Sequence, residues 1–196
     1  MTAARIARVT DPDRVLHADV TAVLTGWPAP HPGQASVREA FLGFLAARPD
    51  ATRRKCAPGH ITASTVVLTP DRRQVLLTLH PRLGRWVQLG GHCERTDSTL
   101  AGAALREATE ESGIGGLAID PVPVHLDVHP VTCSLGVPTR HFDVRFRALA
   151  PDGSRPVISH ESDDLRFWPV DDLPPGFDES DRELIAAALA RGPATA

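Results

Sequence analysis

The chain has 196 residues, of which 42% are hydrophobic and 23% are charged, and its formal net charge is −3. These values predict one soluble globular domain with a terminal extension, and they exclude a general nucleic-acid-binding surface. No segment approaches the ~18 consecutive apolar residues of a membrane span, and the N-terminus lacks the apolar core of a signal peptide. The three scattered cysteines favour a reducing, cytoplasmic location without disulfides.

Residues 1–58 are expected to form an N-terminal helical extension. Residues 13–25 and 36–48 both show helical periodicity, and a Pro/Gly-rich turn at residues 27–34 separates them. Two roles remain open for this helical pair. It either packs on the rest of the protein, with a homodimer contact as one possibility, or it covers the substrate as a lid.

The next segments have strand character. Residues 61–68 are β-branched, and residues 74–80 follow after a turn at Pro70, so the two form a predicted hairpin. Further along, residues 118–128 and 139–148 are expected to be strands joined by a loop. Together with the helices, these strands predict an α/β fold with a mixed sheet between helical layers.

Between the two pairs of strands lies a segment, residues 98–112, that is rich in helix-forming alanine and leucine. Asp97 or Ser98 suits its N-cap, and Gly113 suits a left-handed C-cap. Near the C-terminus, residues 181–190 are expected to form another helix, with Ser180 as its N-cap.

The helix at 98–112 carries an unusual set of carboxylates. Glu107, Glu110 and Glu111 have the spacing i, i+3, i+4, which places them on one helical face. They also lie in the last turns, where negative charge opposes the helix dipole by about 0.3–1 kcal/mol each. Such a cluster is typical of a Mg²⁺ or Mn²⁺ site, and sites of this kind usually act on phosphates.

Residues 91–114 resemble the Nudix box, Gly-x5-Glu-x7-Arg-Glu-U-x-Glu-Glu-x-Gly-U, in which U is an aliphatic residue. Gly91 matches the first glycine, and the run from Arg106 to Ile114 matches the end of the motif in register. Asp97 stands where the motif has its first Glu, and eight residues rather than seven separate it from Arg106. The extra residue lies between loop and helix, where an insertion costs little.

The resemblance extends over about residues 60–190. It implies a Nudix-type α/β/α sandwich with a mixed central sheet over residues 59–191, followed by a loose tail at 192–196. It also implies that Glu107, Glu110 and Glu111 are catalytic and bind Mg²⁺ or Mn²⁺.

Further site residues are expected around these glutamates. The Gly90 carbonyl and Glu161 are candidate metal ligands, with Asp163 and Asp164 as rivals to Glu161. Arg106, which belongs to the catalytic motif, is expected to face away from the glutamates and to brace the preceding loop through Asp97.

Histidines recur near the predicted strand ends. Each is expected either to make structural hydrogen bonds or to bind substrate phosphate and transfer protons near neutral pH. Their spacing does not match a zinc motif such as HExxH. His92 and His141, with Arg85, are the candidate substrate-binding residues. The full set is His80, His92, His129, His141 and His160.

Three functions are compatible with these features. The complete set of box glutamates favours a pyrophosphohydrolase, in which water attacks phosphorus in a nucleoside diphosphate derivative. The alternatives are a catalytically silent nucleotide-binding or regulatory protein and, with less support, a prenyl diphosphate isomerase. We expect a small nucleotide-derived phosphate as the substrate, and neither nucleic acid nor membrane as a partner.

Overall fold

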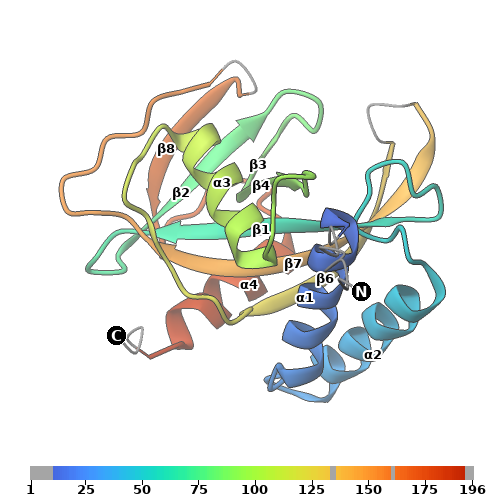
Figure 1. Cartoon of the computed structure of the whole chain (residues 1–196). Helices are drawn as coiled ribbons and strands as arrows, with labels where there is room; N and C mark the ends of the chain where they lie inside the picture. The colour runs from blue at the N-terminus through green and yellow to red at the C-terminus, as the bar shows by residue number, and fades with distance from the viewer. Residues whose placement is uncertain (1–10, 133–135, 160–161, 193–196) are drawn as a thin grey trace, which may run out of the picture.

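A computed structural model describes residues 11–132, 136–159 and 162–192. In these ranges the chain forms two helices, four strands, a third helix, four more strands and a last helix, which Figure 1 shows. In chain order they are α1 (Pro12–Gly26), α2 (Pro32–Ala47), β1 (His60–Leu68), β2 (Gln74–His80), β3 (Arg85–Val87), β4 (Leu89–His92), α3 (Leu100–Ser112), β5 (Ala118–Ile119), β6 (His125–Thr132), β7 (Pro138–Leu149), β8 (Asp164–Pro169) and α4 (Glu179–Ala190).

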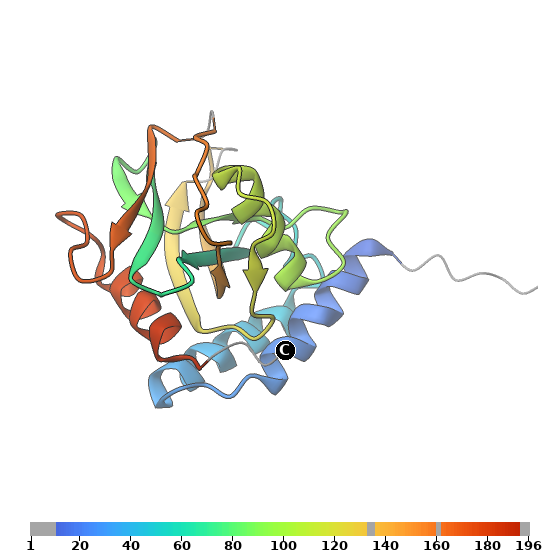
Figure 2. The same cartoon turned by 90° about the vertical axis from the view of Figure 1, so that its left-hand side faces the viewer.

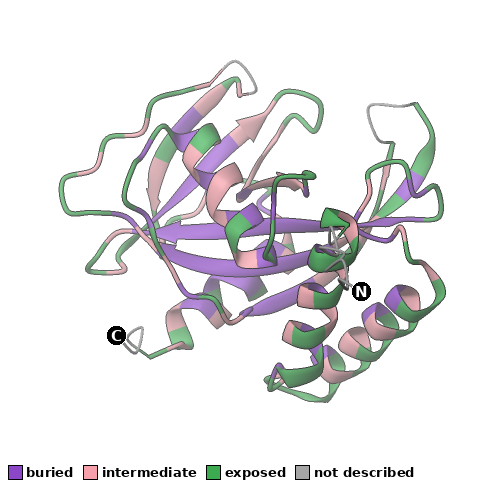
Figure 3. Ribbon diagram, viewed as in Figure 1, coloured by how far each residue is buried: buried purple, intermediate pink, exposed green. Residues whose placement is uncertain are grey.

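All the strands belong to one mixed sheet. β1 and β7 lie side by side in parallel at its centre, and the other pairs are antiparallel. Two strands pair with the other edge of β1: β2 with its C-terminal end and β4 with residues 62–65. β1 and β7 are buried over most of their length (Figure 3).

The helices cover the sheet from both sides, which confirms the expected α/β/α sandwich (Figures 1 and 2). Ile61 and Ala63 of β1 face a core that α1, α2 and α3 share. Val66 and Leu68 face the opposite core, which α4 closes with Leu184 and its neighbours. This split follows from the strand geometry, since successive side chains point to opposite faces.

The N-terminal helices pack on the α3 side of the sheet rather than standing apart. Val20, Leu24 and Phe41 are fully buried in the core that contains β1 and β7. Burying each such side chain contributes about 1.5–3 kcal/mol to folding. The Trp27 indole also donates a hydrogen bond of 2.6 Å to the Pro123 carbonyl. The helical pair is therefore part of the folded body of the protein.

Several predicted boundaries differ from the structure. α2 begins at Pro32, inside the segment predicted as a turn, because proline is well suited to the first turn of a helix. The predicted strand at 118–128 is divided into β5 and β6, and two prolines lie in the gap, at positions 121 and 123. Pro130 lies within β6 instead of the loop, which an edge strand tolerates. Asp178, not Ser180, caps α4.

Candidate active site

The candidate site is centred on Gly90 and Gly91 in β4. Gly90 has φ +150°, and a Cβ atom there would lie 2.5 Å from the Ser64 Cα of β1. A Cβ atom on Gly91 would lie 2.6 Å from the Glu107 Oε2. Gly90 therefore requires glycine, because the backbones are close and φ is positive, whereas a side chain at Gly91 would have to displace the end of the Glu107 side chain.

α3 is fixed at both ends by side chains and by glycine. Thr99, not Asp97 or Ser98, is the N-cap, and its hydroxyl accepts a 3.1 Å hydrogen bond from the Gly102 N–H. Gly113 adopts φ +65° at the C-cap, as predicted. Asp19 of α1 accepts a 2.7 Å hydrogen bond from the Leu100 N–H, so the N-terminal extension helps to position this helix.

The three box glutamates do not have equivalent positions. Glu111 Oε2 accepts a 2.9 Å hydrogen bond from the Gly90 N–H, and the Glu107 carboxylate lies beside Gly91. Glu110 is 62% exposed at its side chain and points to Arg106. The helix therefore brings two carboxylates against the two glycines of β4 and leaves the third exposed.

Arg106 links the loop, the strand and the helix. It donates to both carboxylate oxygens of Asp97, at 3.1 and 2.9 Å, and to the His92 carbonyl at 3.0 Å. The hydrogen bonds that Arg106 donates to Asp97 are the main reason that the pKa of Arg106 is raised. The additional residue before Arg106 thus leaves the Asp97 pair intact.

The expectation that Arg106 faces away from the glutamates is wrong. Its Nη1 atom lies 3.0 Å from a carboxylate oxygen of Glu107 and 3.0 Å from one of Glu110. The contact with Glu110 follows from the i, i+4 spacing, which places the two side chains next to each other on the helix. Arg106 therefore holds the carboxylates in position as well as the loop.

The donor set fits a hard divalent cation. The Glu107 and Glu111 carboxylates both lie against the backbone of Gly90 and Gly91, where β4 has no side chains. Carboxylate and carbonyl oxygens are the ligands that Mg²⁺ prefers. Among the other predicted ligands, Asp164 pairs with Arg166, and Glu161 lies outside the described residues.

The opposite face of the sheet carries a second polar cluster. In β1, β7 and β6, polar residues alternate with apolar ones, and the strand register aligns them in rows across the sheet. Residues in one row face the same side because directly paired residues share a face. The three rows are His60, His141 and His129; Thr62, Asp143 and Asp127; and Ser64, Arg145 and His125.

Asp143 and Arg145 are at the centre of this second cluster. Asp143 accepts hydrogen bonds from the hydroxyls of Thr62 and Ser64 and from Arg145. Burial acts to raise the pKa of Asp143, but Arg145 and the Ser64 hydroxyl hold it below its ordinary value. Burial also raises the pKa of Asp181, from α4, to about 6, although its carboxylate lies 3.4 Å from Arg145.

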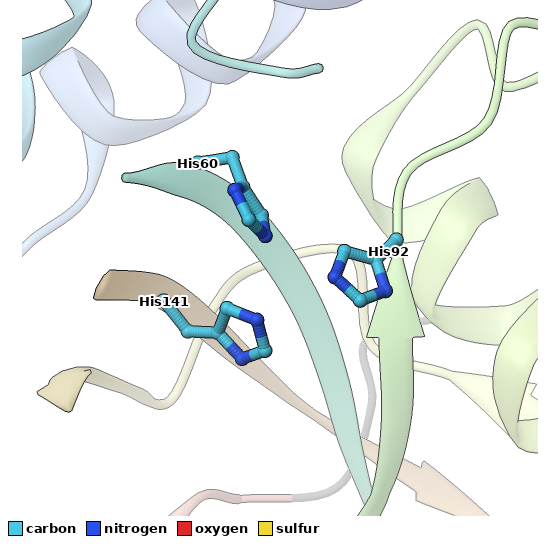
Figure 4. A group of neighbouring side chains, drawn as sticks. All are labelled: His60, His92 and His141. Carbon is cyan, nitrogen blue, oxygen red and sulfur yellow. The ribbon is translucent and has the colours of Figure 1, made fainter. Parts of the chain in front are cut away.

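Two of the predicted substrate-binding residues come together here. His92 and His141 have ring centroids 5.1 Å apart, and both rings lie 5.0 Å from the ring of His60 (Figure 4). The sequence prediction did not include His60. Polar residues alternate with apolar ones in β1, and this pattern could have drawn attention to His60. It does not show which residues lie near His60, because that depends on which strands are neighbours.

The remaining candidates lie elsewhere. Arg85 pairs with Asp178 at 2.7 Å, beside the start of α4. His80, at the end of β2, accepts a hydrogen bond of 3.2 Å from the Arg82 N–H. His129 lies next to His141, with ring centroids 5.3 Å apart. His160 falls outside the described residues.

The model of the NUDIX domain family matches residues 59–188. The chain belongs to the Nudix family. Two of the solved structures that share its fold are named as hydrolases. Among the described residues, none of the helices has the length and apolar character needed to cross a membrane.

Solved Nudix structures share the fold. The Escherichia coli dihydroneopterin triphosphate pyrophosphohydrolase is 20% identical, with a TM-score of 0.51, and the match covers 64% of this chain and 91% of that chain. A Nudix hydrolase from Clostridium perfringens is 22% identical, with a TM-score of 0.51 and coverages of 66% and 93%. The Nudix domain of Shewanella oneidensis NrtR, solved with ADP-ribose, is 25% identical, with a TM-score of 0.50 and coverages of 66% and 85%.

One curated relative is much longer than this chain. The O-acyltransferase ausP of Aspergillus calidoustus is 32% identical over 118 residues, which is 56% of this chain and 24% of the relative. The chain thus spans about a quarter of that protein's length. The similarity is therefore limited to the 118 aligned residues and says nothing of the rest of that protein.

Proposed function

We propose that this Nudix protein is a divalent-metal-dependent pyrophosphohydrolase that cleaves the diphosphate linkage of a nucleoside diphosphate derivative. The observation that carries the proposal is that Glu107 and Glu111 both lie against Gly90 and Gly91 of β4. Carboxylates held in place by an arginine are suited to bind a metal ion that in turn contacts a phosphate. The similarity to the ADP-ribose-bound NrtR domain supports a nucleoside diphosphate as the substrate class.

In this proposal Glu107, Glu110, Glu111 and the Gly90 carbonyl hold Mg²⁺ or Mn²⁺, and Glu161 is a further candidate ligand. A bound metal ion of this type lowers the pKa of water and offsets the charge of the phosphates. The water oxygen bonds to one phosphorus, the bridging P–O bond breaks, and the proton passes to the Glu107 carboxylate. The products are two phosphorylated compounds. Arg106 acts as a positioning residue, since its contacts are with Asp97, the glutamates and the backbone.

The polar face of β1, β7 and β6 is the proposed surface for the rest of the substrate. Most of its residues are buried, yet they place hydroxyl, carboxylate, guanidinium and imidazole groups where a sheet facing a core would carry aliphatic side chains. His92 and His141 remain the candidate substrate-binding residues on this face. Arg85 is a weaker candidate, because its guanidinium pairs with Asp178.

The test is turnover by the purified chain with Mg²⁺ or Mn²⁺ on ADP-ribose, nucleotide sugars and dinucleoside polyphosphates. We expect metal-dependent release of two phosphorylated products, and a fall of at least about 100-fold in Glu111→Gln, which corresponds to about 2.7 kcal/mol. Glu39→Gln, an exposed glutamate of α2, is the matched control and should keep full activity.

A different result would favour the second candidate function, a nucleotide-binding protein without catalysis. In that case no compound is hydrolysed, but one of them raises the melting temperature. Such a result would overturn the pyrophosphohydrolase and leave the binding site in place.

A further inference from the structure

Three imidazole rings meet at one end of the polar face. His60 begins β1, His92 ends β4 and His141 lies near the start of β7 (Figure 4). The three centroid separations are 5.0, 5.0 and 5.1 Å, so the rings form a nearly equilateral triangle. One ring nitrogen from each residue lies within 4.8 Å of the other two.

The strand register places this triangle on the side of β4 away from the box glutamates. His60 pairs with His141, and His92 pairs with Thr62, which is two residues from His60 and faces the same side. Gly91 precedes His92 and faces Glu107. Because successive strand residues point to opposite faces, the imidazoles and the Glu107 carboxylate are separated by the backbone of β4.

Two of the ring nitrogens are buried without any hydrogen-bond partner: Nε2 of His60 and Nε2 of His141. The other nitrogen of His60, Nδ1, lies 3.5 Å from the Cys56 carbonyl. A proton on Nδ1 directed at this carbonyl leaves the lone pair on Nε2, the arrangement that a metal-binding histidine usually has. An unsatisfied buried polar atom is costly, and two such atoms facing one space indicate a ligand.

The electrostatic environment keeps the rings neutral, which is the form that binds a metal ion. Burial, together with the neighbouring imidazoles of His129 and His60, lowers the pKa of His141 to about 4. Burial also lowers the pKa of His60, and Arg54 acts in the same direction. The buried Asp143 carboxylate, two residues from His141 on the same face, supplies negative charge nearby.

We propose that His60, His92 and His141 bind a divalent transition-metal ion, for which Zn²⁺ is the probe, at a site separate from the carboxylate site of α3. Imidazole nitrogens are typical ligands of Zn²⁺ and poor ligands of Mg²⁺. Tetrahedral coordination at about 2.0–2.1 Å places ligand nitrogens about 3.4 Å apart, so small side-chain rotations close the site. Three protein ligands leave the fourth position for water or an oxygen of a bound molecule.

The test uses the full, untagged chain, stripped with a chelator and then titrated with Zn²⁺. Metal content is measured after gel filtration, and binding is followed by calorimetry. We expect one Zn²⁺ per chain in the wild type and in Glu111→Gln, and loss of this ion in His141→Gln. His31→Asn is the matched control, because it removes an exposed histidine at the N-cap of α2 and keeps a good capping residue.

Zn²⁺ retained by His141→Gln would overturn the site, and its loss from Glu111→Gln in the same experiment would assign the ion to the carboxylate site instead. Circular dichroism shows whether His141→Gln is folded. If it is not, the visible spectrum of the Co²⁺-loaded wild type decides. Strong tetrahedral bands support the site, and the weak bands of an octahedral oxygen site contradict it. These readouts are independent of hydrolysis, so they stand whether or not the proposed activity is found.

Discussion

The two faces of β4 carry different chemistry. On the side of α3, acidic side chains and one arginine surround Gly91, and an extensive set of charged hydrogen bonds fixes them. On the other side, His92 joins two imidazoles that have buried nitrogens without partners. The carboxylate face depends on the spacing of residues within one helix, whereas the histidine face depends on the register of strands that are far apart in the sequence.

The largest effects on the carboxylate side of β4 are expected from substitutions of its two glycines. Gly90→Ala should lower the free energy of unfolding by about 3 kcal/mol or more, because φ is +150° and the Ser64 backbone lies 2.5 Å from the new Cβ atom. Gly91→Ala meets only the movable end of Glu107, so we expect a loss of stability below about 1 kcal/mol and a loss of turnover of about 10-fold. Urea denaturation and initial rates measure these effects. Equal stability losses in the two variants would contradict the geometry.

The carboxylate face should depend on the shape of Arg106 as well as on its charge. Arg106→Gln leaves the nearly buried Asp97 carboxylate without its partner, and we expect a loss of about 3 kcal/mol in the free energy of unfolding. Arg106→Lys keeps the charge but cannot donate to Asp97 with a planar fork, so it should be intermediate. Chemical denaturation of both variants at pH 7 checks this order. A Lys variant as stable as the wild type would show that charge alone is enough.

The polar face should respond to pH through Asp181. An unfolded aspartate titrates near 3.9, but burial raises the pKa of Asp181 to about 6. The folded state therefore binds this proton more tightly. The resulting stabilisation is fully present below about pH 4 and is lost as the pH rises through about 6.

Asp181→Asn is neutral at every pH and removes this dependence. Relative to the wild type, it should gain on the order of 2 kcal/mol between pH 4 and pH 7. Denaturation midpoints across this range measure the difference, with Asp152→Asn, on an exposed loop, as the control. A parallel pH profile for the wild type and Asp181→Asn would show that folding does not raise the pKa of Asp181.

The smallest effect concerns the start of α3. Thr99→Ala removes the hydroxyl that accepts from the Gly102 N–H, and it should cost about 1 kcal/mol. Ser98→Ala, one position earlier, should leave the stability almost unchanged. Thermal denaturation of the two variants distinguishes them. A larger loss in Ser98→Ala would move the N-cap back to the residue that the sequence suggested.

Local sequence was sufficient for the parts of the protein that depend on neighbouring residues. Helical periodicity predicts the shared face of Glu107, Glu110 and Glu111 and the two helices α1 and α2. The tolerance of glycine for positive φ predicts the left-handed Gly113. The structure has each of these features. The Nudix-type sandwich was also predictable, because the motif fixes the order of strand, turn and helix. Local sequence was less reliable at element ends, as α2 and the split between β5 and β6 show.

Only the tertiary structure decided which distant residues meet. His60 and His141 are far apart in the sequence, and no pattern within either strand indicates that β1 and β7 are parallel neighbours. Arg106 likewise donates to the His92 carbonyl of β4, a contact that the sequence of α3 alone does not determine. The physical reason is that helix geometry fixes neighbours within a few residues, whereas the register of a mixed sheet is set by the packing of both its faces.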